Sequence, residues 1–146
     1  MKVKDILSRK GSEIYSTTPE TTVYDAISKM SKLNIGALLV MDGDFLAGIV
    51  SERDYRNKVI LQGRTSRETR VVEIMTRDLI TVKPDDRVQL CMQLMTENKV
   101  RHLPVLNGRE VVGVISIGDV VKTVIDSQRG EINSLREYIS AGGSYH

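Results

Sequence analysis

The chain contains Gly48-Ile-Val-Ser-Glu-Arg-Asp54 and, 65 residues later, Gly113-Val-Ile-Ser-Ile-Gly-Asp119. In both segments an apolar run with a glycine leads directly into the pattern Ser-x-x-Asp. A serine followed three residues later by an acid is typical of a helix N-terminus. The two segments therefore predict the same unit twice, a strand that passes at once into a helix.

The duplication covers most of the chain. Residues 17–60 align with residues 82–125 without a gap, and a preceding segment also repeats, because Val3–Arg9 resembles Val71–Arg77. Such self-similarity predicts two copies of one architecture. We expect repeat one at residues 1–61, a linker at 62–70, repeat two at 71–127, and a C-terminal helix and tail at 128–146 with the helix over Glu131–Ser140.

Each copy predicts the element order β-α-β-β-α. Apolar residues at helical spacing follow a short β run, and two strands and a second helix come after them. Asp42-Gly43 and Asn107-Gly108 are two-residue hairpin signals, because these residues tolerate positive φ. The expected β runs are Ile14–Thr17 and Leu79–Val82; the hairpin strands are Ala37–Met41 with Phe45–Val50, and His102–Leu106 with Glu110–Ile115.

The first helix of each copy carries a cap signal and an apolar face. Thr22 with Asp25, and Asp86 with Gln89, have the spacing of an N-terminal capping box. The apolar faces are Val23, Ala26, Ile27, Met30 and Leu33, and Val88, Cys91, Met92 and Met95. Each copy alone is marginal in size, so we expect the two to pack face to face in an α/β (α+β) fold.

Composition excludes several classes of function. The 21 basic and 19 acidic residues give a net charge of +2, too balanced for a nucleic-acid binder, and there is no Trp for stacking bases. The basic stretch Gln62–Arg70 is either a solvated linker or a phosphate-binding patch. We expect no secretory signal and no membrane span. The single cysteine, Cys91, excludes a disulfide framework and fits a reducing cytoplasm.

Catalytic signals are weak. Cys91 aligns with Ala26 on an apolar helix face, which predicts a small buried side chain. His102 is the one internal histidine and has no nucleophile at a recognisable spacing. No phosphate loop, hydrolase motif or metal-ligand motif is present. We therefore expect a protein that is not an enzyme and holds no metal.

The paired Ser-x-x-Asp motifs have two compatible interpretations. Ser51 with Asp54, and Ser116 with Asp119, can cap their helices. The acids can also accept hydrogen bonds from ribose hydroxyls, beside a helix N-terminus suited to an anion. Gly48 and Gly113 indicate either a close approach of a ligand or tight packing between the copies. Among the basic residues near these motifs, Arg53, Arg101 and His102 are either surface charges or phosphate ligands.

These segments, together with Val71-Val-Glu-Ile-Met75 and Val100-Arg-His-Leu-Pro-Val105, resemble a tandem pair of CBS domains, or Bateman module. The resemblance implies two repeats packed about a pseudo-twofold axis, with two clefts between them. Such clefts bind AMP, ADP or ATP, and in some members NAD(H) or S-adenosylmethionine. It also implies a symmetric homodimer in the form of a flat disc.

The resemblance further implies which residues line the clefts. One cleft would use Tyr15, Ile35, Gly36 and Ala37 with Ser116 and Asp119. The other would use Ile80, Val100, Arg101 and His102 with Ser51 and Asp54, and the phosphate candidates are Arg53, Arg101 and His102. The repeats differ where Arg101-His102-Leu103-Pro104 replaces Gly36–Leu39 and where Gly118 replaces Arg53. We therefore expect two clefts of unequal ligand preference.

The implied function is a non-catalytic regulatory module. It would sense energy or redox state through AMP, another adenine nucleotide or NAD(H), and signal to an unidentified partner protein in trans. An alternative is a structural protein–protein interaction module with vestigial clefts. A small nucleotide hydrolase is a third hypothesis, although the sequence offers it no base, nucleophile or metal cluster.

Overall fold

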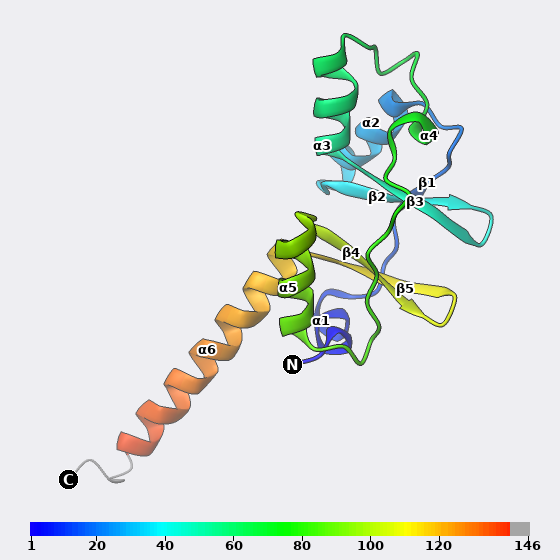
Figure 1. The fold of residues 1–146 in the computed structure, drawn as a ribbon. Helices are drawn as coiled ribbons and strands as arrows, with labels where there is room; N and C mark the ends of the chain where they lie inside the picture. Colours follow the sequence, from blue (N-terminus) through cyan, green and yellow to red (C-terminus); the bar gives the residue numbers. More distant parts are fainter. Residues whose placement is uncertain (141–146) are drawn as a thin grey trace.

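The computed structural model describes residues 1–140 and divides into two similar halves (Figure 1). Each half has a long antiparallel hairpin with helices at the end opposite its turn, α2 and α3 in one half and α5 and α6 in the other. Repeat one follows the expected order β-α-β-β-α, and repeat two follows it from its first helix onward. The mixed α/β architecture with two similar repeats is therefore confirmed.

Repeat one contains the complete unit. It comprises β1 (Ser16–Thr17), α2 (Val23–Leu33), β2 (Ala37–Asp42), β3 (Phe45–Ser51), α3 (Glu52–Lys58) and the 3-10 helix η1 (Ile60–Gln62). β2 lies between β1, its parallel neighbour, and β3, its antiparallel neighbour. Thr22 caps α2 by accepting a hydrogen bond from the Asp25 amide at 3.2 Å, which is one half of the predicted capping box.

Repeat two lacks the first strand. It comprises α5 (Val88–Asn98), β4 (His102–Asn107), β5 (Glu110–Ser116) and α6 (Ile117–Ser140). The strand expected over Leu79–Val82 is reduced to one bridge between Val82 and Val105. In repeat one the Leu39 amide donates to the Tyr15 carbonyl at 3.2 Å. Its counterpart is Pro104, which has no N–H to donate.

The start of α5 also differs from the expectation. Its N-cap is Arg87, which forms no side-chain cap bond, so the predicted Asp86–Gln89 capping box is wrong. The Asp86 carboxylate accepts instead from the Lys83 amide at 2.7 Å, in the turn before the helix. The Met1 carbonyl accepts from the Val88 amide at 3.1 Å, so the N-terminal segment satisfies the first amide of α5.

Both hairpins turn one residue later than predicted. β2 ends at Asp42 and β3 begins at Phe45, so the turn residues are Gly43 and Asp44 rather than Asp42 and Gly43. Gly43 has φ +62°, and the equivalent Gly108 has φ +66°. Glycine with positive φ at the first central position is the signature of a type II′ turn.

The segments before the two repeats are exchanged. α1 (Val3–Lys10) buries Val3 and Ile6 in the core of repeat two, and α4 (Val71–Ile74) buries Val71 and Ile74 in the core of repeat one. Figure 1 shows α1 beside α5 and α4 beside α2. Each repeat therefore completes its core with a helix that precedes the other repeat's strands.

The mid-strand glycines accommodate these exchanged segments. A Cβ on Gly48 would lie 2.7 Å from the Thr76 carbonyl oxygen, and one on Gly113 would lie 2.6 Å from Leu7 Cδ2. Both contacts are closer than real Cβ atoms tolerate. The register also shifts beside both glycines, as expected at a bulge. Tight backbone packing accounts for both glycines, against the segment that precedes the other repeat.

The separate C-terminal helix expected over Glu131–Ser140 is wrong, because α6 runs unbroken from Ile117 to Ser140. Gly130 lowers helix propensity but does not end the helix. The second half of α6 extends away from the rest of the molecule (Figure 1). Residues 141–146 of the expected tail lie outside the described residues.

Candidate functional site

Two of the pockets between the repeats contain the expected site residues, and each is lined by residues of both repeats. The first cleft, about 490 Å³, is lined by residues around Tyr15 and Gly36 of repeat one and by His102, Ser116 and Asp119 of repeat two. The second cleft, about 330 Å³, is lined by Ser51–Asp54 of repeat one and by Lys99–His102 of repeat two. This arrangement matches the shared clefts that the resemblance implied.

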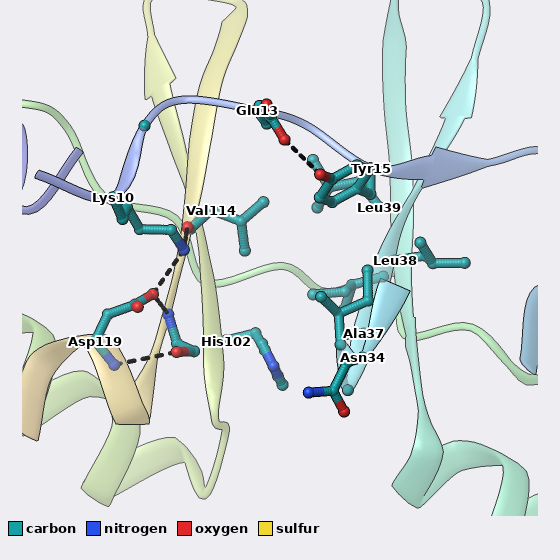
Figure 2. Close-up of a pocket in the computed structure, with 15 residues that line it drawn as sticks. Lys10, Glu13, Tyr15, Asn34, Ala37, Leu38, Leu39, His102, Val114 and Asp119 are labelled. Carbon is teal, nitrogen blue, oxygen red and sulfur yellow. Dashed lines mark hydrogen bonds and ion pairs between the residues drawn. The ribbon is translucent and has the colours of Figure 1, made fainter. Parts of the chain in front are cut away.

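The first cleft brings together all six residues expected in it. Figure 2 shows Tyr15 and Ala37 on one side of the cleft and Asp119, near the start of α6, on the other. Ile35, Gly36 and Ser116 also line it. The Tyr15 hydroxyl donates to the Glu13 carboxylate, and this hydrogen bond raises the pKa of Tyr15. Lys10, Glu13 and Asn34 also line this cleft and were not anticipated from the sequence.

The second cleft brings together all but one of its expected residues. Ser51, Arg53 and Asp54 face Val100, Arg101 and His102. Ile80 is the exception, since it does not line this cleft and packs against the core of repeat two. The cause is local: its segment forms no strand because Pro104 cannot pair with it as Leu39 pairs with Tyr15.

Both Ser-x-x-Asp motifs cap their helices and line a cleft at the same time. The Asp54 carboxylate accepts from the Ser51 amide at 2.9 Å, and the Asp119 carboxylate accepts from the Ser116 amide at 2.8 Å. In return each serine hydroxyl accepts from the aspartate amide, at 3.3 Å and 3.1 Å. The capping role is therefore present in both repeats, with each carboxylate held at the cleft wall.

The two carboxylates have different cationic partners. Asp119 pairs with Lys10 of α1 at 2.7 Å, whereas Asp54 pairs with Lys58 of its own helix at 2.9 Å. Burial opposes ionisation of Asp119, but hydrogen bonds from Lys10 and the Ser116 amide outweigh it and lower the pKa of Asp119. Asp119 is therefore a carboxylate at neutral pH.

Charge distinguishes the two clefts. The second is lined by three cations, Arg53, Lys99 and Arg101, against the two carboxylates of Glu52 and Asp54. The first is lined by Lys10 alone against the carboxylates of Glu13 and Asp119. Arg53 Nη1 donates to the Lys99 carbonyl at 3.0 Å, which joins the two repeats across the second cleft. A phosphate is favoured electrostatically in the second cleft over the first.

His102 and Gly36 line both clefts and mark their shared wall. A Cβ on Gly36 would lie 3.6 Å from His102 Cε1, so the imidazole packs against this glycine. Burial lowers the pKa of His102, Lys10 and Arg101 lower it further, and Asp119 opposes them. The imidazole is therefore mainly neutral at pH 7, with hydrogen-bonding capacity at the point where the clefts meet.

The basic linker is engaged within the fold. Arg64 pairs with Glu73, and the Arg67 guanidinium lies 3.8 Å from the centre of the Tyr24 ring. Arg70 donates to the Glu20 carbonyl at 2.7 Å. These contacts favour the structural interpretation of residues 62–70 over a phosphate-binding patch.

Cys91 is fully buried in the core of repeat two, as its alignment with Ala26 predicted. Burial raises the pKa of its thiol to about 11. Within residues 1–140, no three His, Cys, Asp or Glu side chains cluster as metal ligands. None of the helices described combines the length and apolar character needed to cross a membrane.

Comparison with known proteins agrees with this arrangement. The model of the CBS domain matches residues 3–60 and 71–126. The CBS domain-containing protein CBSX3, mitochondrial, of Arabidopsis thaliana is 44% identical, and the alignment covers 96% of this chain and 72% of that protein. A solved protein with CBS domains from Burkholderia ambifaria MC40-6 is 53% identical, with a TM-score of 0.85 over 88% of this chain and 96% of that one.

A further solved structure contains ligands. The CBS domain pair of protein MJ0100, in complex with 5-methylthioadenosine and S-adenosyl-L-methionine, is 27% identical. It superposes with a TM-score of 0.76 over 87% of this chain and 98% of that one. Two matched domains, the shared fold and the plant relative at 44% identity lead to one conclusion: this chain belongs to the CBS domain family and is a tandem CBS pair.

Proposed function

We propose that this CBS pair is a non-catalytic sensor that binds adenosine-containing ligands in its two clefts. The observation that carries the proposal is the shared construction of each cleft. An aspartate at a helix start of one repeat faces the segment before a hairpin strand of the other. A ligand that bridges these groups stabilises one arrangement of the repeats, which is how binding would reach a partner protein in trans.

We assign the ribose to the aspartates. Asp119 Oδ2 already accepts from the Ser116 amide and from Lys10, and Oδ1 has no hydrogen bond within the described residues. Asp54 Oδ2 accepts from the Ser51 amide in the same way, while its Oδ1 pairs with Lys58 at 2.9 Å. A fixed carboxylate beside helix amides is suited to accept hydrogen bonds from vicinal ribose hydroxyls.

The charges support a division of ligands between the clefts. The second cleft, with Arg53, Lys99 and Arg101, suits the phosphates of AMP, ADP or NAD(H). The first cleft, with Glu13 and Asp119 against Lys10, suits an adenosine group that carries no phosphate, such as 5-methylthioadenosine or S-adenosylmethionine. Both ligands of the MJ0100 domain pair are adenosine compounds without a phosphate.

Calorimetric titration of the full chain tests the proposal. AMP, NADH and S-adenosylmethionine are titrated into the wild type, Asp54→Asn and Asp119→Asn. We expect Asp54→Asn to weaken AMP and Asp119→Asn to weaken S-adenosylmethionine, each by roughly tenfold or more, because a charge-assisted hydrogen bond is worth about 1.5–3 kcal/mol. The asparagine Oδ1 can still accept the hydrogen bond from the serine amide at the helix start, so stability should fall by only about 1 kcal/mol or less.

Three other results of these experiments would contradict the proposal. If both variants bind as the wild type does but unfold earlier, the aspartates are helix caps and the ribose assignment is wrong. If the wild type binds none of these ligands at millimolar concentration, the pair is an interaction module with vestigial clefts. Product formation after long incubation with AMP or ATP would instead identify a hydrolase.

The homodimer, the partner in trans and the cytoplasmic location belong to the same proposal. The lone buried Cys91 motivates a reducing compartment. The plant relative is by its name mitochondrial, so the compartment of this chain stays a prediction. Fractionation of the source cells with an antibody against the chain would decide between the two.

A further inference from the structure

The second half of α6 has an apolar stripe with no partner in the monomer. Every side chain from Ser127 to Ile139 is exposed. Ile132, Leu135 and Ile139 are 49%, 60% and 42% exposed. An isolated helix of this length is marginal in water, and Gly130 weakens it further. The extension therefore needs a surface to pack against.

The spacing of the stripe identifies the kind of surface. The stripe consists of Val121, Ile125, Gln128, Ile132, Leu135 and Ile139. The positions of these residues advance alternately by four and three, which is the heptad repeat of a coiled coil. Isoleucine occupies each a position, and leucine occupies the d position at 135; isoleucine at a with leucine at d favours two parallel helices. The exposure of Val121 (49%) and Ile125 (41%) shows that the stripe continues to the base of α6.

The charges beside the stripe select the relative orientation of the two paired helices. The e positions hold Lys122, Arg129 and Arg136, all cationic, and Glu131 occupies a g position. In a parallel pair, Glu131 of one copy faces Arg136 of the other, five residues further on. In an antiparallel pair, e positions face each other, so the three cations would repel. Neither Glu131 nor Arg136 has an ion-pair partner within residues 1–140.

We infer that α6 is a dimerisation helix and that its occupant is α6 of a second copy of this chain, packed in parallel and in register. The outward positions of the heptads fit this arrangement, since Ser127, Asn133, Ser134 and Glu137 are polar. Gln128 lies at a d position, where a polar residue specifies register at some cost in stability. Figure 1 shows that the second half of α6 extends away from the two repeats, so the inference does not depend on ligand binding in the clefts.

Sedimentation equilibrium of the full chain without nucleotide tests the interface. We expect a dimer for the wild type and for Asn133→Asp, an outward control. Ile132→Asp should raise the dimer dissociation constant by roughly a hundredfold, since it buries a charge in the seam. A wild type that is monomeric at ~100 µM, or an Ile132→Asp dimer of unchanged affinity, would overturn the inference.

Charge-swap and cysteine variants test the orientation of the two helices. Glu131→Arg and Arg136→Glu should each weaken the dimer about two- to fivefold, and the double charge swap should restore it. Leu135→Cys should form a disulfide between copies on mild oxidation, because a parallel in-register pair places this position opposite itself. Asn133→Cys should not. Failure of Leu135→Cys to cross-link, or a double swap weaker than either single variant, would exclude the parallel arrangement.

Discussion

The Lys10 ammonium donates a hydrogen bond of 2.7 Å to the Asp119 carboxylate and another of 2.9 Å to the Val114 carbonyl. Lys10 ends α1, whereas Asp119 lies in the first turn of α6. This contact ties the exchanged N-terminal helix to the helix start of repeat two. The same two side chains form one wall of the first cleft, so stability and ligand preference are coupled there.

Lys10→Met should lower the free energy of unfolding by about 0.5–1 kcal/mol at about pH 7, since the pair is partly exposed. The pKa of Asp119 is lowered in the folded state, so its contribution is present above the ordinary aspartate value of 3.8 and is lost as pH falls through the folded-state pKa. The difference between variant and wild type should therefore shrink as the pH falls below 3.8.

Urea unfolding at about pH 7 and below pH 3.8 measures the difference in unfolding free energy between Lys10→Met and the wild type. Lys4→Met is the matched control, because Lys4 pairs with Asp85 at 3.1 Å on a far more exposed surface. An equal loss for both lysine variants, independent of pH, would show that the Lys10–Asp119 pair contributes nothing specific.

Gly48→Ala should destabilise the fold more than Gly113→Ala. The new methyl at position 48 meets the Thr76 carbonyl, which is fixed by paired backbone bonds to Ile49. The methyl at position 113 meets the end of the flexible Leu7 side chain. We expect losses of about 2–3 kcal/mol and about 1 kcal/mol. Thermal and urea unfolding of both variants would check the order, and a larger loss at position 113 would contradict it.

The exchange of α1 and α4 predicts which half each truncation loosens. Ile6→Ala should raise amide exchange in repeat two, around Leu103 and Ile115, and Ile74→Ala should do so in repeat one, around Leu38 and Val50. Each substitution should cost about 2–4 kcal/mol, because both side chains are fully buried. Faster exchange in the half that the residue precedes in sequence would show that the segments are not exchanged.

The duplicated pattern was sufficient to predict most of the architecture. The strand-to-helix junctions at Ser51 and Ser116 lie where the Ser-x-x-Asp pattern placed them, because serine and aspartate satisfy helix amides locally. Twelve of the thirteen expected site residues line the clefts, with Ile80 as the exception. The ligands of the two clefts stay predictions, because residues that line a pocket do not by themselves show binding.

What the sequence could not predict depends on contacts between distant segments. Lys10 reaches the first cleft only because α1 packs on repeat two, and nothing in the local sequence near Val3 indicates which repeat it joins. The missing strand at Leu79–Val82 depends on the absent amide of Pro104, which the repeat alignment with Leu39 could have revealed. Asn34 and Lys99 could have been found because each directly precedes an expected cleft residue, Ile35 and Val100.

Asn34 and Lys99 provide a matched pair for testing backbone strain. Both end their helices with φ near +54° and +53°, a conformation that asparagine tolerates better than lysine. Lys99→Asn should therefore raise the free energy of unfolding by about 0.5–1 kcal/mol, and Asn34→Lys should lower it by a similar amount. Lys99→Asn should also weaken AMP, because it removes a cation from the second cleft. A Lys99→Asn protein that is less stable would show that the lysine side chain outweighs the strain.

His102 should make stability depend on pH near neutrality. Burial lowers the pKa of its imidazole in the folded state, with Lys10 and Arg101 adding to the effect. The contribution of His102 is therefore complete above the ordinary value of 6.5 and is lost as pH falls toward the folded-state pKa. The melting temperature should fall as the pH is lowered from about 8 to about 5, and His102→Asn should flatten that dependence.

A phosphate held by Arg101 beside His102 would stabilise the imidazolium, so AMP binding should take up protons near pH 6. Calorimetry in buffers of different ionisation enthalpy measures that uptake, and NMR titration of His146→Asn, which leaves one histidine, follows the imidazole directly. An imidazole that titrates at or above 6.5 in the free protein would contradict the buried shared wall, and AMP binding without proton uptake would place the phosphate away from His102.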